Sequence, residues 1–300
     1  MATAENFLDF LADALRFPYD EPPNSDPSSV ARLRKLPTSD LQWVEAGQAA
    51  ATPLTVLATD RFGRPVEGAE ITFQRIGGNG QFQAAGGTSW VGQVTVLSDR
   101  LGLAQTRYRP PTSVQESDQM GLVHRSPDDL YPTWVGHNLI QVIATSGSGP
   151  IVAPAPFEIF LAPSEATGVL AGTVGETAAP LSIQGPINLL VLDEFGNSVS
   201  NVLVQAEVGE VTSQCPFDAS GALSTQILAD GESCNIHMIT GGDLPEACLG
   251  QTLELISSET GVYFHLLTSN VHFGETPIQI TLDSGIEGIY THYSGGHDLP

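Results

Sequence analysis

The 300-residue sequence predicts an all-β protein made of two tandem antiparallel β-sandwiches, preceded by a short N-terminal helix. Two observations lead to this prediction. From residue 40 onward, short runs alternate apolar and polar residues with the period of two that a half-buried antiparallel strand requires. The same order of strands and turns then occurs twice along the chain, which is typical of a duplicated domain. A hydrophobic content of 41% gives both copies enough apolar residues for a buried core.

The first 38 residues are predicted to form an amphipathic helix and a linker. Residues 4–16 place apolar side chains at near-helical spacing with acidic residues on the other side, and a proline and a Pro/Ser/Asp-rich stretch follow. The helix either packs on its own domain, docks into the groove of a partner, or forms a frayed tail. Under the docking hypothesis, the residues that would contact the partner are Phe7, Phe10 and Leu11.

The strand predictions rest on local alternation. In residues 54–59 and again in residues 69–74, every second side chain is apolar and most of those between are polar. Further strand-like runs, separated by turn residues as in a sandwich, lie at 94–97, 104–109, 139–145, 157–161 and 278–282.

An internal repeat supports the duplication. Residues 53–66 align without a gap on residues 186–199 at an offset of 133, and both segments contain the motif Asp-x-Phe-Gly-x-x-Val. The turn at 99–102 aligns on 218–221 at an offset of 119. The smaller offset means that the first copy has longer loops, which a duplicated domain tolerates. The predicted parts are 1–38 (helix and linker), 39–163 (first sandwich), 164–270 (second sandwich with an inserted loop) and 271–300 (a C-terminal strand extension).

Four aspartates begin the repeated turns: Asp60, Asp99, Asp193 and Asp218. An aspartate side chain can accept hydrogen bonds from the backbone amides that follow it, and the glycine of each motif supplies a positive φ without steric strain. The alternative is that these aspartates bind calcium. Calcium requires several converging oxygen ligands, and each turn offers one or two. The sequence therefore favours structural turns, keeps calcium as the alternative, and predicts no other cofactor.

The order of these motifs, found twice, resembles the bacterial immunoglobulin-like domains of the invasin and intimin type. Segments that begin at Gly47 and Gly172 are similar to the lead-in segments of that family. The resemblance covers residues 40–163 well and, in the second copy, extends to about residue 227. It implies a seven-stranded immunoglobulin-like sandwich, repeated in tandem as a rod or stalk that presents or spaces something.

Two segments depart from this pattern. The first is a long insertion at residues 110–135, where Tyr131 and Trp134 are candidate partner-binding residues if the loop is a binding surface, and packing residues if it is not. A carbohydrate-binding surface that uses these two aromatics and Trp90 is a further, weaker hypothesis.

The second departure is residues 228–250, which contain Cys234 and Cys248. A disulfide between these cysteines would fix the loop and require an oxidising compartment. Free buried thiols are one alternative. A zinc site that also uses Cys215 is another, although close paired Cys spacing is missing.

Charge excludes two classes of partner. The chain has 34 acidic and 11 basic residues, a formal net charge of −23, and all its basic residues lie at or before Arg125. Nucleic acid and anionic membrane surfaces would repel such a chain. No apolar run approaches the roughly 20 residues of a membrane helix, so no membrane insertion is expected. No nucleophile elbow, phosphate loop or dinucleotide motif occurs, and we expect no enzymatic activity.

These features favour a non-enzymatic structural or adhesive spacer at a cell or particle surface. The alternative is a structural subunit or decoration of a filament, phage tail or contractile injection assembly that docks through its N-terminal segment. The expected partner is another protein or a second copy of this chain, with a surface glycan as the weaker hypothesis. Because acidic residues occupy the start of the chain, no secretory signal is visible there. We expect an extracellular or cell-surface location reached without a visible signal peptide, or alternatively a place in a virion or injection particle.

Overall fold

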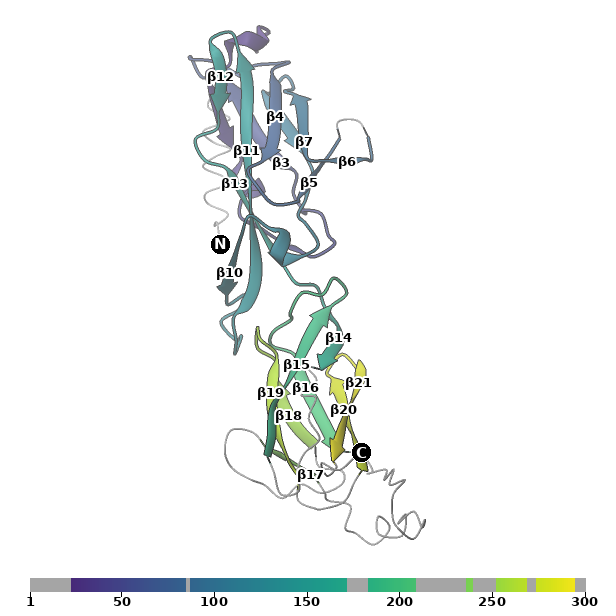
Figure 1. Ribbon diagram of the computed structural model, residues 1–300. Helices are drawn as coiled ribbons and strands as arrows, with labels where there is room; N and C mark the ends of the chain where they lie inside the picture. Colours follow the sequence, from purple (N-terminus) through teal and green to yellow (C-terminus); the bar gives the residue numbers. More distant parts are fainter. Residues whose placement is uncertain are drawn as a thin grey trace, which may run out of the picture. The chain divides into compact units, whose positions relative to one another are not determined.

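The computed structural model describes residues 23–84, 87–171, 183–208, 236–239, 252–268 and 274–294 (Figure 1). Within these ranges the chain is all-β, which confirms the predicted fold class, and its helical elements are three 3-10 turns. These turns are η1 (Pro27–Ser29), η2 (Pro37–Ser39) and η3 (Val114–Glu116). The helix predicted over residues 4–16 lies outside the described residues. No helix in the described part of the chain has the length and apolar character of a membrane span.

The chain divides into two compact units. Unit 1 contains the residues up to Leu122 together with residues 134–164, and unit 2 contains residues 123–133 together with the residues from Glu165 onward. The insertion predicted at residues 110–135 is thus shared between the two units.

Unit 1 is a sandwich of two main sheets. The first has the order β1-β3-β8: β1 (Arg32–Lys35), β3 (Leu54–Thr59) and β8 (Leu103–Thr106). The second has the order β2-β13-β11-β4-β7: β2 (Gln42–Glu45), β13 (Phe157–Ala162), β11 (Thr133–Ser146), β4 (Glu70–Arg75) and β7 (Gln93–Leu97). Two more strands pair with β11: β10 (Gln119–Val123) and β12 (Gly149–Val152). A small third sheet contains β5 (Gln81–Gln83), β6 (Trp90–Val91) and β9 (Tyr108–Arg109).

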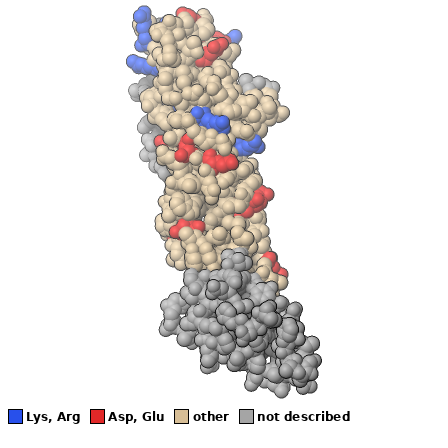
Figure 2. Space-filling model, in the orientation of Figure 1, with Lys and Arg blue, Asp and Glu red and all other residues tan. Residues whose placement is uncertain are grey.

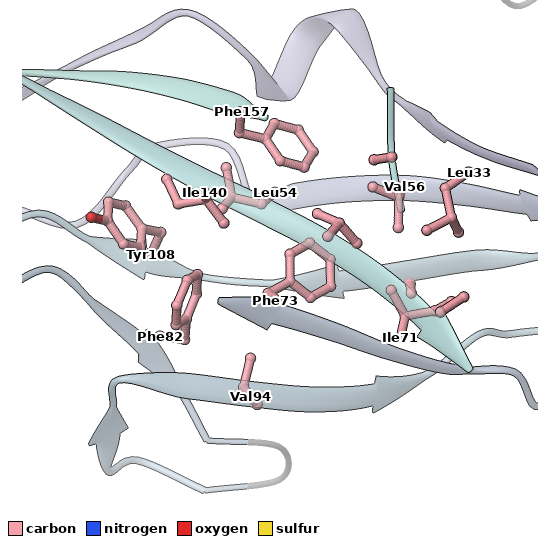
Figure 3. Packing of buried hydrophobic residues seen from close by; sticks show 14 of the residues in the cluster. Leu33, Leu54, Val56, Ile71, Phe73, Phe82, Val94, Tyr108, Ile140 and Phe157 are labelled. Carbon is pink, nitrogen blue, oxygen red and sulfur yellow. The ribbon is translucent and has the colours of Figure 1, made fainter. Parts of the chain in front are cut away.

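The core of unit 1 lies between its two main sheets (Figure 3). The alternation predicted for residues 54–59 and 69–74 is confirmed, since every second side chain of both segments is apolar and fully buried: Leu54, Val56, Ala58, Ala69, Ile71 and Phe73. The Phe73 and Phe157 rings pack with their centroids 6.4 Å apart. Aliphatic and aromatic side chains therefore fill the space between the sheets, and their burial is the main stabilising contribution.

One polar residue of β3 departs from the alternation. Thr55 is buried because η2 covers it, and its backbone nitrogen donates to the Ser39 hydroxyl at 3.2 Å. Residues 24–38, predicted as a linker, supply η1, β1 and η2 to unit 1. In β1, Leu33 points into the core at 3% exposure between two exposed arginines. A single apolar residue between arginines gives no alternation long enough to predict a strand.

Unit 2 is also a sandwich of two sheets. One sheet has the order β14-β15-β19-β17: β14 (Ala166–Ala171), β15 (Ile183–Asp193), β19 (Val262–Thr268) and β17 (Ile236–Ile239). The other has the order β18-β16-β20-β21: β18 (Thr252–Ile256), β16 (Leu203–Val208), β20 (Gly274–Leu282) and β21 (Glu287–Ser294). The core includes Leu189, Val191, Val204, Ile278 and Ile280. The strand predicted at 278–282 is thus part of β20, and both β20 and β21 belong to this second sandwich.

The repeated aspartate motif has the same topological role in both units. In unit 1 the motif connects β3 to β4, and in unit 2 it connects β15 to β16. Each of these strand pairs is divided between the two facing sheets. The motif is therefore a corner that takes the chain from one sheet of the sandwich to the other, and the two strands that it joins do not form a hairpin.

We predict that Tyr108 makes unit 1 sensitive to alkaline pH. Its ring is 1% exposed and packs on Phe82 at 5.2 Å. Burial raises the pKa of Tyr108 well above its usual value of 10.0, and the charge of Asp118 raises it further. The folded phenol keeps its proton at a pH where the unfolded phenol loses it. The resulting stabilisation is complete below pH 10 and decreases as the pH rises above it, by about 1.4 kcal/mol per pH unit.

The Tyr108→Phe variant should lack this alkaline decline, whereas Tyr263→Phe, which alters a phenol that is 45% exposed, should keep it. Urea unfolding followed by tryptophan fluorescence measures the effect, because all three tryptophans of the sequence lie in unit 1. An unchanged alkaline decline in Tyr108→Phe would contradict the prediction.

Candidate functional site

Asp60 is the centre of the corner in unit 1. Its side-chain carboxylate is 3% exposed. Oδ1 accepts hydrogen bonds from the backbone nitrogens of Phe62 at 2.8 Å and Arg64 at 3.0 Å. Oδ2 accepts from the Arg64 guanidinium at 2.8 and 2.9 Å and from the Asn24 amide at 3.2 Å. The predicted turn-closing hydrogen bonds are therefore present, and an arginine and an asparagine complete the set.

The electrostatics of this carboxylate follow from its partners. Burial by itself would raise the pKa of Asp60, but the hydrogen bonds from Arg64, Asn24 and Phe62 together hold the pKa below its usual value of 3.8. Asp60 is thus ionised whenever unit 1 is folded near neutral pH. Its contribution to stability is present above pH 3.8 and is lost as the pH falls through the lowered pKa.

Unit 2 repeats this corner with an asparagine at the position of the arginine. Asp193 is 4% exposed, and its Oδ1 accepts hydrogen bonds from the backbone nitrogens of Phe195 at 2.9 Å and Asn197 at 2.8 Å. The Asn197 side-chain amide donates to Oδ2 at 2.8 Å. Asn197 stands where Arg64 stands in the first copy, so a neutral amide has the role of the guanidinium.

Of the other two predicted aspartates, only Asp99 lies within the described residues. Asp99 is exposed, and its Oδ1 accepts hydrogen bonds from the backbone nitrogens of Leu101 at 2.8 Å and Leu103 at 2.9 Å. Asp218 lies outside the described residues. Among the described residues, no group of three or more His, Cys, Asp or Glu side chains could hold a metal ion. Calcium binding at these aspartates stays the untested alternative to structural turns.

The structure places the predicted binding residues of the insertion in different units. Tyr131 belongs to unit 2, where its backbone nitrogen and oxygen bond to the side chain of Asn201 at 2.9 and 2.8 Å. Trp134 is half-buried on β11 and belongs to unit 1. Trp90 is half-buried on β6, with the Arg109 guanidinium 4.7 Å from its ring centroid. The remaining predicted site residues lie outside the described residues: Phe7, Phe10, Leu11, Cys234 and Cys248.

A row of three aromatic rings on unit 1, which we call the aromatic ladder, was not predicted. Trp43, Phe160 and His137 lie opposite one another on the neighbouring strands β2, β13 and β11. The Trp43 and Phe160 ring centroids are 5.1 Å apart, and those of Phe160 and His137 are 5.0 Å apart, with interplanar angles of 23° and 7°. The rings therefore stack face to face across three strands.

The ladder lies on the outer face of its sheet. Trp43 is 44% exposed, and β2 is the edge strand of the sheet. His137 Nε2 lies 3.2 Å from a carboxylate oxygen of Glu158, so a polar pair borders the rings. The inward side chains that alternate with the ladder, such as Ile159 and Val44, belong to the core. The core thus fixes the strands, and the strands hold the rings in place.

No protein-family model matches the chain, and no curated protein matches it. Solved structures similar to it include the Yersinia pseudotuberculosis adhesin InvE (12% identity, TM-score 0.31, 90% of this chain and 60% of that one). They also include Yersinia pseudotuberculosis InvD (14% identity, TM-score 0.41, 91% of this chain and 72% of that one). A third is invasin, described as a bacterial integrin-binding protein (12% identity, TM-score 0.36, 89% of this chain and 41% of that one). The chain thus spans less than two thirds of InvE and of invasin. These neighbours are of the invasin type that the sequence motifs resemble, and likenesses of this size assign neither an activity nor a partner.

We predict that Asp60→Asn destabilises unit 1 by about 2–4 kcal/mol. The NH2 group of the new amide would face the N–H donors of Arg64 and Asn24, and the Arg64 guanidinium would lose its buried counter-charge. Asp99→Asn alters an exposed turn of the same unit and should cost less than about 1 kcal/mol. Urea unfolding followed by tryptophan fluorescence gives both values. Equal losses in the two variants would contradict the central role of the Asp60 carboxylate.

Proposed function

We propose that this chain is a non-enzymatic adhesive spacer of a cell or particle surface, in which two immunoglobulin-like sandwiches carry a contact surface on unit 1. The aromatic ladder is the observation that supports this proposal. Three stacked rings on the outer face of a sheet contribute nothing to the buried core, and Trp43 presents 44% of its surface to solvent. The adhesin role named for InvE is of the same kind, but the proposal rests on the residues of this chain.

The ladder has the physical properties of a binding surface. Aromatic rings bring a large apolar area to an interface and lose little side-chain entropy, so they dominate the binding energy of many protein complexes. Here Phe160 is stacked between Trp43 and His137, so the rings are ordered before a partner arrives. A surface that is ordered in advance gives more of its contact energy to affinity.

Charge restricts the partner. Glu158 lies beside the ladder, and the chain as a whole carries a formal charge of −23. A polyanionic partner would be repelled, whereas a neutral or basic protein surface would be attracted. A protein partner therefore fits this surface best, and a neutral glycan that stacks on Trp43 is the alternative outcome.

The test is adhesion of coated beads. Beads that carry the purified chain should be retained under flow on bacterial lawns or animal-cell monolayers, and the Trp43→Ala and Phe160→Ala variants should lower retention about ten-fold or more. Leu97→Ala is the matched control, because it removes a 65% exposed apolar side chain from the same sheet away from the ladder. Prior protease treatment of the cells should abolish retention.

If glycosidase treatment abolishes retention and protease treatment does not, the partner is a glycan. Circular dichroism and thermal unfolding of each variant establish that it is folded. Retention of folded Trp43→Ala beads at the level of the unmodified chain would overturn the proposal, as would retention no higher than that of uncoated beads on every surface.

A further inference from the structure

An open groove of about 540 Å³ lies beside the Asp60 corner of unit 1. Arg61, Phe62 and Arg64 of the corner line it on one side, and Ser28 of η1 and Ser148 of the β11–β12 turn also contribute. The backbone nitrogen of Gly147 donates to the oxygen of Ser28 at 2.9 Å, which joins η1 to that turn. The groove is thus built from three segments that are distant in the sequence.

Phe62 and the two arginines beside it give the groove a border that is both apolar and basic. Phe62 is 68% exposed, and the guanidinium carbons of Arg61 and Arg64 lie 4.6 and 5.5 Å from its ring centroid. Asp60 neutralises Arg64, whereas Arg61 forms no ion pair in the part of the chain that the structure describes. Arg100 is 86% exposed, and its Nε lies 3.5 Å from a carboxylate oxygen of Glu67. This surface therefore presents an aromatic ring together with positive charge, which suits a partner that combines an apolar side chain with carboxylates.

Unit 2 carries a surface of the opposite kind. The last 175 residues contain 20 acidic residues and neither lysine nor arginine. On unit 1, by contrast, Figure 2 shows basic side chains together with acidic ones. The edge strand β21 carries Ile289, which is 72% exposed, and Glu287, which is also exposed. Asp283 is exposed in the turn that leads into this strand. Among the described strands, β21 is thus the edge of its sheet, and its exposed Ile289 follows two exposed carboxylates in the sequence.

We propose that the Phe62 groove of one molecule binds the β21 edge of a second copy of this chain. Phe62 would contact Ile289, and Arg61 and Arg100 would face Glu287 and Asp283. The two surfaces differ, so the contact is heterologous and every copy keeps one groove and one edge for further neighbours. The long-range repulsion between two chains of charge −23 opposes this contact, and it restricts association to the arrangement that places arginines against carboxylates.

The experiment is sedimentation velocity of the full chain and two double variants. Arg61→Ser/Phe62→Ser removes the groove contacts, and Glu287→Ser/Ile289→Ser removes the edge contacts. All four residues are exposed, so the variants should fold normally. The unmodified chain should show a sedimentation coefficient that rises with concentration, and each double variant alone should lose at least ten-fold in association constant.

Mixing the two double variants gives the decisive result. The first keeps an intact edge and the second an intact groove, so the mixture should form a one-to-one pair and nothing larger. Arg107→Ser is the control for charge, because it removes an exposed arginine that directly follows β8 and does not line the groove, and it should leave association unchanged.

An unmodified chain that stays monomeric at every concentration would overturn the inference. Association of either double variant at the level of the unmodified chain would also overturn it, as would a mixture that stays monomeric. The ladder residues are intact in both double variants, so the bead-retention result is independent of this outcome.

Discussion

In both units a buried aspartate carboxylate closes the corner where the chain leaves one sheet of the sandwich for the other. Removing a carboxylate from water costs several kcal/mol, and only a full set of hydrogen bonds offsets that cost. Asp60 receives bonds from two backbone amides, a guanidinium and an asparagine amide, and Asp193 receives them from two backbone amides and an asparagine amide. The corner fixes the strands on either side of it. Because a strand shifted by one residue exposes its buried face, the position of the corner also determines which side chains enter the core.

The two copies of the corner have diverged in charge. In unit 1 the partner of the aspartate is Arg64, which also lies beside the exposed ring of Phe62. In unit 2 the partner is Asn197, and the corresponding Phe195 is half-buried. Replacing the guanidinium by an amide keeps the corner closed in a part of the chain that has neither lysine nor arginine. The same duplicated motif therefore presents arginines on one unit and an asparagine at the matching position of the other.

Local features of the structure could be predicted from the sequence. The alternation in residues 54–59 and 69–74 and the hydrogen bonds of Asp60 and Asp193 depend on neighbouring residues, and each is present as expected. Features that depend on pairing between distant segments could not. β2 pairs with β13 in the parallel direction, and only this pairing brings Trp43 beside Phe160. A single aromatic residue in a short segment carries no signal for a stack that forms across three strands.

The central claim is that hydrogen bonds outweigh burial at the Asp60 carboxylate, and its pKa measures that balance directly. An NMR titration that follows the carboxyl carbon of Asp60 in the folded chain gives the value. The account predicts a pKa below the usual 3.8. A pKa at or above 3.8 would mean that burial dominates, and it would contradict the role given to this carboxylate in closing the corner.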